Sequence, residues 1–305
     1  MIRYALITPA RNEATLIEKT IQSVVAQTHR PERWVIVDDG STDGTARIVR
    51  KYVDRFLWIE LARRPEHLER SFAGKVHAFN AGLEKIENLQ IDVLGNLDAD
   101  VSFEPDYLQM LMRRFAEDPR LGVAGTPFLE NGYDSAKDSF EGENHVAGGC
   151  QLFRYNCFRD IGGYVPNRAG GIDWIAVTTA RMKGWKTRSF PDLRFHHYRP
   201  LGTAERGLLA ATFSYGEKDY YLGNSPIWEL FRVAYRTTKQ PRIAGGLALL
   251  CGYLWAALRR IQRPVSPELM RFHRREQMRK LKAILLNLVR FRKVDNFSLA
   301  TGHVR

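Results

Sequence analysis

Short apolar runs alternate with segments of helical periodicity through residue 130, and this alternation limits the possible folds more than any other feature of the sequence. Between the first two runs, apolar residues recur at helical spacing from Leu16 to Val25, and Asn12 stands where it can cap that helix. Repeated β-α-β units give a mostly parallel sheet with helices on both faces, so we predict an α/β fold. The apolar runs lie at residues 4–9, 34–38, 56–61, 91–97 and 123–128.

The rest of the chain changes character in two steps. From 131 to 200, glycine pairs mark loops around a predicted helix at 173–183 and two strands, at 185–190 and 193–198. After Pro200 the apolar pattern becomes helical throughout. The predicted helices of this last part lie at 204–221, 225–238, 241–261 and 267–292.

These changes predict two domains of different charge. The first is an α/β domain at residues 1–222, with halves at 1–130 and 131–222, and the second is a helical region at 223–305. The chain of 305 residues has a net charge of +12. Residues 259–305 hold 13 Lys and Arg against 3 Asp and Glu, so almost all of the net positive charge lies at the C-terminal end.

A basic tail can meet nucleic acid, an anionic membrane or an acidic partner, and charge alone does not choose among them. Nucleic-acid-binding segments commonly interleave basic and aromatic residues. After Phe272, however, the apolar residues are chiefly aliphatic and recur at helical spacing, as on an amphipathic helix. We therefore expect an anionic membrane surface as the partner of this region and expect no nucleic acid.

An apolar run at 243–258 supports the membrane interpretation. It has 16 residues, whereas a simple spanning helix needs about 20, and basic residues flank it on both sides. Trp255 lies within it, as in helices that rest at a membrane interface. No export signal is visible near the N-terminus, and the three cysteines form no CxxC pair, which fits a reducing compartment. We predict a peripheral protein on the cytoplasmic face of a membrane.

Polar and acidic clusters follow three of the predicted strands. They are Thr8-Pro-Ala-Arg-Asn-Glu13, Val37-Asp-Asp-Gly-Ser-Thr-Asp-Gly-Thr45 and Leu97-Asp-Ala-Asp100. The carboxyl ends of parallel strands share one edge of the sheet, where ligands of α/β proteins bind. At the end of an extended strand, Asp98 and Asp100 would point to the same side. Paired carboxylates of this kind suit Mg²⁺ or Mn²⁺, although each cluster taken alone is also ordinary turn chemistry.

The order of these motifs resembles the inverting family-2 glycosyltransferases of GT-A fold. The resemblance also includes Gly74-Lys75, Asn80-Ala-Gly-Leu83 and a later glycine loop, and it covers about residues 2–200. It implies a nucleoside-diphosphate sugar as donor. It places Lys75 near the nucleotide, and Asp98 and Asp100 at the metal and the diphosphate. The residues that it places around the rest of the donor are Pro9, Ala10, Glu13 and Asp39.

The resemblance also indicates a catalytic base. Family members carry it in a Glu-Asp pair after a glycine loop, and here the matching stretch is Gly170-Gly-Ile-Asp-Trp174, so Asp173 takes the base position and Ile172 replaces the usual Glu. Read without the family, Asp173 is an N-cap of the following helix. In some relatives a histidine approaches the metal after the last strand, so His196 or His197 is a candidate third ligand. Arg11 stands where an aromatic residue is often found.

The implied reaction is transfer of one sugar, with inversion, to a hydroxyl of a glycan or lipid-linked acceptor in cell-surface polysaccharide or glycolipid synthesis. The Gln-x-x-Arg-Trp segment of processive synthases does not follow Asp173. A second enzyme class is the sugar nucleotidyltransferases, which usually have a Gly-rich loop after the first strand, where this chain has Pro9-Ala-Arg-Asn-Glu13. Outside the enzymes, the basic tail would suit a nucleic-acid-binding protein, and the same fold could serve as a catalytically silent scaffold.

Overall fold

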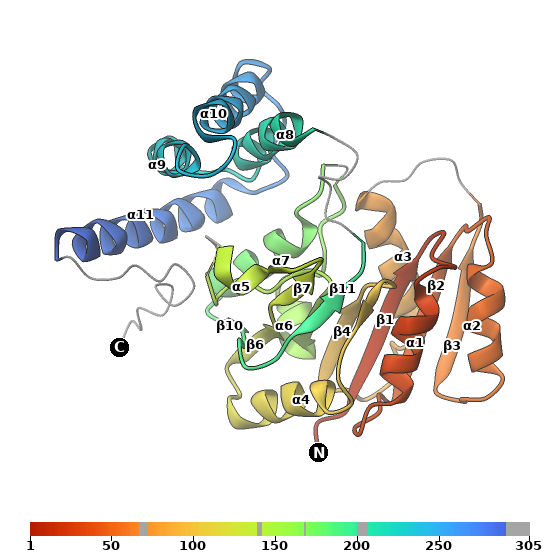
Figure 1. The fold of residues 1–305 in the computed structure, drawn as a ribbon. Helices are drawn as coiled ribbons and strands as arrows, with labels where there is room; N and C mark the ends of the chain where they lie inside the picture. The colour runs from red at the N-terminus through yellow and green to blue at the C-terminus, as the bar shows by residue number, and fades with distance from the viewer. Residues whose placement is uncertain (67–71, 139–141, 168, 200–206, 291–305) are drawn as a thin grey trace. The chain divides into compact units, whose positions relative to one another are not determined.

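The computed structural model describes residues 1–66, 72–138, 142–167, 169–199 and 207–290 (Figure 1). The chain divides into two compact units, Met1–Arg199 and Pro200–Arg305. The sequence predicts a boundary at residue 222 instead. The difference arises because helix α8 (Leu208–Tyr221) packs against a later helix of the second unit, α10 (Arg242–Leu258).

The first unit is built on a seven-stranded sheet with the strand order β10-β6-β9-β4-β1-β2-β3. Neighbouring strands are parallel except at β9, which runs antiparallel to both β4 and β6. The mostly parallel α/β prediction is therefore confirmed. The strands are β1 (Tyr4–Ala10), β2 (Arg33–Asp39), β3 (Ile59–Arg64), β4 (Val93–Leu97), β6 (Leu121–Gly125), β9 (Cys150–Arg154) and β10 (Lys186–Ser189).

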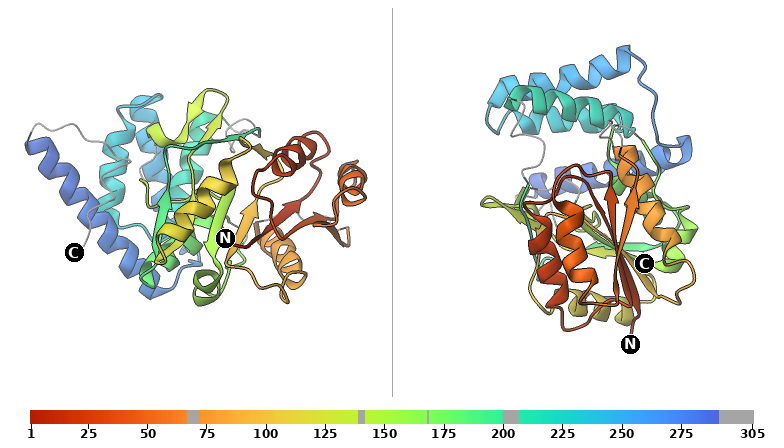
Figure 2. Two further views of the ribbon diagram at one scale, coloured as in Figure 1. Left: turned by 90° about the horizontal axis from the view of Figure 1, so that it is seen from below. Right: turned by 90° about the vertical axis from the view of Figure 1, so that its right-hand side faces the viewer.

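Helices cover both faces of this sheet (Figure 2). Alternate residues of β1 divide between two cores: Tyr4 and Leu6 pack with α1, α2 and α4, whereas Ala5 and Ile7 pack with α3, α6 and α7. This alternation is what a strand buried on both faces requires, since successive side chains point in opposite directions. The helices are α1 (Ile17–Val25), α2 (Thr45–Val53), α3 (Phe72–Glu84), α4 (Tyr107–Glu117), α5 (Ser135–Asp138), α6 (Tyr155–Asp160) and α7 (Ile172–Met182).

A second, four-stranded sheet follows the order β5-β11-β7-β8. Its central strand β11 pairs antiparallel with β5, where His197 faces Val101, and parallel with β7. This pairing joins the end of the first unit to the segment just after β4. The strands are β5 (Val101–Ser102), β7 (Phe128–Glu130), β8 (Tyr133–Asp134) and β11 (Phe195–His197).

Two local predictions were wrong, and one strand was missed. Strand β9 was not foreseen, although it lies inside the main sheet between β4 and β6. Asn12 does not cap α1, whose N-cap residue is Leu16; instead Asn12 has a φ of 54° and its side-chain oxygen accepts a hydrogen bond from the amide of Thr42 at 2.9 Å. The predicted strand at 123–128 is divided, because β6 ends at Gly125 and β7 begins at Phe128.

The second unit is helical in its described part, as the sequence predicts. Helices α8 and α10 are joined by α9 (Pro226–Arg236), and α11 (Pro267–Val289) follows them. The side chain of Ser266 caps α11 by accepting a hydrogen bond from the amide of Leu269 at 3.1 Å. Among the described helices, none combines the length and the apolar character that are needed to cross a membrane.

Candidate functional site

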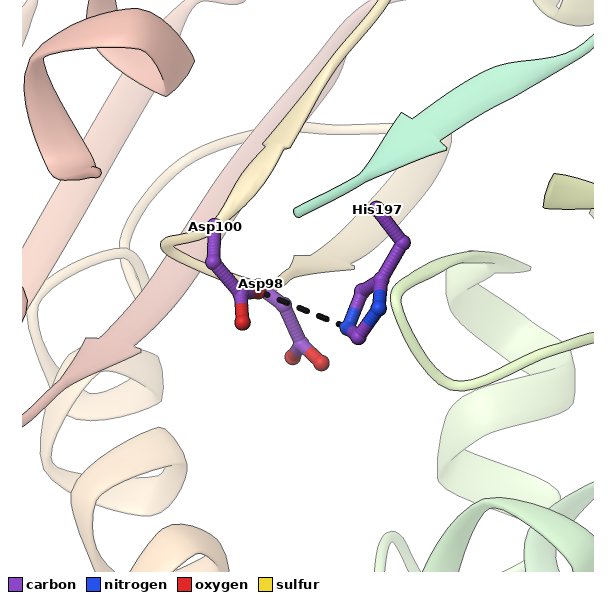
Figure 3. A group of neighbouring side chains, drawn as sticks. All are labelled: Asp98, Asp100 and His197. Carbon is purple, nitrogen blue, oxygen red and sulfur yellow. Dashed lines mark ion pairs between the residues drawn. The ribbon is translucent and has the colours of Figure 1, made fainter. Parts of the chain in front are cut away.

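Two aspartates and one histidine lie together at the carboxyl end of β4. One ligand atom from each of Asp98, Asp100 and His197 lies within 4.8 Å of the others (Figure 3). The Nε2 atom of His197 is 3.7 Å from an Oδ atom of Asp100. Carboxylate oxygens and an imidazole nitrogen form a donor set that suits a divalent cation such as Mn²⁺. The residues present therefore fit the metal that the sequence predicts.

The two aspartates are close together, but the backbone conformation that brings them together differs from the predicted extended strand. Asp98 and Asp100 lie in the turn between β4 and β5 rather than at alternate positions of an extended strand. The amide of Asp98 donates to the carbonyl of Gly149 at 2.9 Å, and the amide of Tyr198 donates to the carbonyl of Asp100 at 3.0 Å. Two later parts of the chain therefore fix this turn.

The pairing of β11 with β5 selects His197 over His196. The two histidines are adjacent on the strand, so their side chains point in opposite directions. His196 is exposed, whereas the side chain of His197 is only 11% exposed and reaches the aspartates. The Nδ1 atom of His197 is 3.1 Å from a carboxylate oxygen of Glu130. Because a carboxylate accepts, Nδ1 is the nitrogen that donates to Glu130, and Nε2 is the nitrogen that faces the aspartates.

Burial and nearby negative charge make the ionised form of the Asp100 carboxyl unfavourable when no cation is bound. Asp100 is 7% exposed. Its burial, followed by the negative charge of Asp98, raises the pKa of the Asp100 carboxyl, while His197 and Arg199 act in the opposite direction. A divalent cation between the two carboxylates would relieve this repulsion.

Lys75 lies in the first turn of α3 and forms an ion pair with Asp98. Burial lowers the pKa of Lys75, but the nearby carboxylates outweigh this effect and raise the pKa above its ordinary value. These carboxylates are those of Asp98, Asp173 and Asp100. Lys75 is therefore a fixed positive charge at the site, as expected for a residue that faces a phosphate group.

Asp173 lies in the first turn of α7, whose N-cap residue is Gly171 in the left-handed conformation. The predicted N-cap role of Asp173 is therefore wrong. Its carboxylate lies against the backbone of Gly148, where a Cβ atom would come within 3.0 Å of Oδ2. The side chain of Asn96 at the end of β4 donates to the carbonyl of the same Gly148 at 3.1 Å. The Gly148 loop thus links Asp173 to the strand that leads to Asp98.

A second acidic cluster lies at the carboxyl ends of β1 and β2. Register pairs Ala10 of β1 with Asp38 of β2, and the next residue, Asp39, is 5% exposed and forms an ion pair with Arg64 of β3. Glu13 is 6% exposed, and its amide donates to the hydroxyl of Thr45 at 2.8 Å. Pro9 and Ala10 form the end of β1 itself. The predicted donor residues at these two strand ends therefore lie along one edge of the sheet.

Arg199 connects the two clusters, and the sequence did not single it out. Its guanidinium donates to a carboxylate oxygen of Glu13 at 2.5 Å, and its Nε atom lies 3.9 Å from a carboxylate oxygen of Asp100. The signal available in the sequence was proximity, because Arg199 lies two residues after His197, just past the end of β11. Arg64 and Glu130 were also missed, since each acts through a pairing between distant strands.

This arrangement can bind a group that carries several negative charges. A cluster of carboxylates repels a diphosphate unless a divalent cation offsets their charge, and Asp98, Asp100 and His197 can hold such a cation. Lys75 and Arg199 add two positive side chains beside it. Asp173 is a carboxylate that the metal cluster does not include, so it is available to accept a proton.

Comparison with protein families and curated proteins gives one consistent match. The model of the family "Glycosyl transferase family 2" matches residues 5–162, slightly more than half of the chain. A poly-beta-1,6-N-acetyl-D-glucosamine synthase of Staphylococcus aureus (strain COL) is 31% identical over 123 residues, which cover 39% of this chain and 27% of that protein. The synthase of Staphylococcus epidermidis is 25% identical over 202 residues, covering 59% of this chain and 44% of that protein. The chain thus matches less than half the length of these relatives.

Solved structures share the fold along nearly the whole chain. The mannosyltransferase PcManGT from Pyrobaculum calidifontis, in complex with GDP-Man and Mn²⁺, has a TM-score of 0.56 and 20% identity and covers 98% of this chain and 85% of its own. Residues 1–349 of Staphylococcus aureus TarS, in complex with UDP-GlcNAc, have a TM-score of 0.55 and 14% identity and cover 94% of this chain and 82% of their own. At these identities the likeness establishes a GT-A-like fold.

Proposed function

Because the chain belongs to glycosyl transferase family 2, we propose that it is an inverting, metal-dependent glycosyltransferase. It moves one sugar from a nucleoside-diphosphate sugar to a hydroxyl of a glycan or a lipid-linked acceptor. The observation that carries this proposal is the Asp98-Asp100-His197 cluster, with Asp173 and Lys75 beside it, at the carboxyl edge of the sheet. Solved structures with the same fold hold GDP-Man with Mn²⁺ or UDP-GlcNAc.

The proposed reaction is an in-line displacement at the anomeric carbon of the donor sugar. Asp173 takes the proton of the acceptor hydroxyl, whose oxygen forms the new bond to that carbon. The bond from the carbon to the diphosphate oxygen breaks, and the diphosphate leaves with the electron pair, so the configuration inverts. A bound Mg²⁺ or Mn²⁺ supplies Lewis-acid stabilisation of the departing diphosphate. Lys75 and Arg199 bind and orient the same diphosphate through their positive charges.

Different residues would bind different parts of the donor. Asp98 and Asp100 would hold the metal ion that binds the diphosphate, whereas the nucleoside would lie against the ends of β1 and β2. Pro9, Ala10, Glu13 and Asp39 line that part, where Glu13 and Asp39 are nearly buried and already paired with arginines. Buried polar groups that are held in place give a site that needs little rearrangement when the ligand binds.

The C-terminal region supports a location at the cytoplasmic face of a membrane, next to a lipid-linked acceptor for cell-surface polysaccharide or glycolipid synthesis. Residues 259–305 carry 13 Lys and Arg against 3 Asp and Glu. A surface of this sign attracts anionic lipid headgroups. The enzyme would then act on acceptors that stay at the membrane.

The test that separates this proposal from a sugar nucleotidyltransferase is the product released from the donor. With UDP-GlcNAc or GDP-Man, Mn²⁺ and a panel of glycan and glycolipid acceptors that take up the sugar, we expect release of UDP or GDP. We also expect the accepted donor to raise the unfolding midpoint by several degrees because it binds only the folded chain. Pyrophosphate release from a nucleoside triphosphate and a sugar phosphate would establish the nucleotidyltransferase instead. If no nucleotide sugar of a broad panel stabilises the protein with Mn²⁺, the transferase proposal fails.

Replacing Arg199 by glutamine is expected to weaken donor binding about tenfold, the usual scale for one charge-assisted hydrogen bond. The variant removes one of the cations that face the diphosphate and leaves Glu13 without its arginine. Turnover at saturating donor should change little. Calorimetric titration with the nucleoside diphosphate and Mn²⁺ measures the affinity.

Arg194→Gln is the matched control for this variant. Arg194 lies five residues earlier and pairs with Asp134 at 3.4 Å, outside the metal cluster. Its replacement should leave donor affinity unchanged. Equal affinity of the Arg199 and Arg194 variants would show that Arg199 has no role in donor binding.

A further inference from the structure

One face of α10 is exposed and apolar along its whole length. Its exposed residues are spaced so that they form one stripe on the helix, here called the α10 stripe. The stripe consists of Ile243, Leu247, Leu254, Trp255 and Leu258, which are 69%, 56%, 49%, 45% and 80% exposed. Isolated apolar residues on a surface need no explanation, but a continuous stripe of this kind marks an interaction surface.

The opposite face of α10 packs against α8. A Cβ atom on Gly252 would lie 2.0 Å from the carbonyl oxygen of Phe213, and one on Gly216 would lie 2.0 Å from the carbonyl oxygen of Leu249. The two backbones therefore touch at these glycines, and α10 cannot rotate to bury the stripe without losing that contact. The stripe stays on the outside of the helical pair.

The sequence that contains α10 and its flanking segments carries charges of one sign only. Residues 230–267 contain seven Lys and Arg and no Asp or Glu. Two of the seven, Arg259 and Arg260, are exposed directly after α10, and Lys239 and Arg242 are exposed at its start. Positive charge thus flanks the apolar stripe at both ends, which complements a surface that is apolar inside and negatively charged at its edge.

Trp255 marks the boundary between the apolar and the charged parts. The guanidinium of Arg259 lies over its ring, 4.6 Å from the ring centroid. Tryptophan and arginine placed in this way are typical of helices at the headgroup level, where the ring meets acyl chains and the cation meets phosphate. A helix of 17 residues covers about 25 Å along its axis, so it can lie in the plane of the membrane.

We propose that the α10 stripe inserts into the surface of an anionic lipid bilayer, with α10 parallel to the membrane plane and the flanking arginines on lipid phosphates. This inference deepens the proposed function. It rests on that function for the assumption that the enzyme binds its acceptor at the membrane. A second copy of this chain is a poorer occupant, because pairing two stripes brings the like charges at the helix ends together.

The experiment is flotation of the full-length protein with vesicles, without donor or acceptor. Wild type should float with vesicles of phosphatidylcholine and phosphatidylglycerol and should do so far less with phosphatidylcholine alone. The double variant Leu254→Glu, Trp255→Glu places two carboxylates on the stripe, and we expect at least about a tenfold loss of the partition coefficient. The pair Arg259→Gln, Arg260→Gln should lower binding to anionic vesicles and weaken its dependence on salt.

Leu57→Glu is the matched control, since Leu57 is 96% exposed in the first unit and lies outside the stripe. It should float as wild type does. Equal unfolding midpoints show that the stripe variant is folded, and if that variant does not fold, the Arg259 and Arg260 pair carries the test. Equal flotation of all variants would overturn the proposal.

Two further measurements, of the oligomeric state and of donor turnover, distinguish this proposal from its alternatives. If light scattering shows a wild-type dimer that the stripe variant converts to a monomer without loss of flotation, the stripe is a contact between copies and the proposal is wrong. Release of nucleoside diphosphate from the donor is measured separately, in solution and in the presence of the acceptor panel. If that release is absent while flotation depends on the stripe, the membrane surface stands and the transferase proposal fails.

Discussion

Replacing Asp173 by asparagine is expected to lower turnover by roughly a hundredfold or more, the usual scale for the loss of a general base. Asparagine has nearly the same shape but cannot take the proton of the acceptor hydroxyl. Asp173 lies outside the Asp98-Asp100-His197 cluster, so the metal set stays complete in the variant. We therefore expect donor affinity close to that of wild type, measured by calorimetry, beside the loss in steady-state turnover.

Asp106→Asn serves as the matched control. Asp106 is an exposed residue directly before α4, and its side chain makes no capping hydrogen bond there. The variant should keep wild-type turnover. A different result would reassign Asp173: if donor affinity collapses while turnover at saturating donor survives, Asp173 binds the donor rather than acting as the base.

Excess chelator is expected to lower transfer on the order of a hundredfold or more, because the proposed cation would offset the charge of the departing diphosphate. Asp98→Asn and Asp100→Asn should have a similar effect while the protein stays folded. The same two variants should weaken binding of Mn²⁺ itself, which electron paramagnetic resonance measures without any substrate.

The two adjacent histidines give a sharp control for the metal site. His197→Ala removes the proposed ligand atom Nε2, which lies 3.7 Å from a carboxylate oxygen of Asp100, whereas His196 is exposed on the other side of the strand. We expect weaker Mn²⁺ binding and lower turnover for His197→Ala and neither effect for His196→Ala. Full activity in excess chelator, or identical behaviour of the two histidine variants, would refute the proposed metal site.

The sequence determined the kind of fold and the edge of the sheet where the candidate site lies. Apolar runs that alternate with helical segments are a local signal, and right-handed β-α-β crossovers leave little choice in how they assemble. Strands β1, β2 and β4 lie close to their predicted positions, so the polar residues that follow them meet at one edge. Local spacing and the rules of parallel sheets are enough for this step.

Local spacing was insufficient where the outcome depends on contacts between distant residues. Strand β9 is a short apolar segment after two glycines, and only its pairing with β4 and β6 makes it a strand of the main sheet. Asp173 has the sequence pattern of an N-cap, but Gly171 takes that position in the structure. In both cases tertiary contacts outweigh the local preference.

The tertiary structure alone decided which side chains complete the candidate site. The sequence offered His196 or His197 as equals, and the register of β11 against β5 brings His197 to Asp100. The same strand carries the chain on to Arg199, which reaches Glu13 across 186 positions of sequence. A one-residue change of register turns every side chain of a strand to its other face. Since register is fixed by pairing between distant segments, no local pattern in the sequence could decide it.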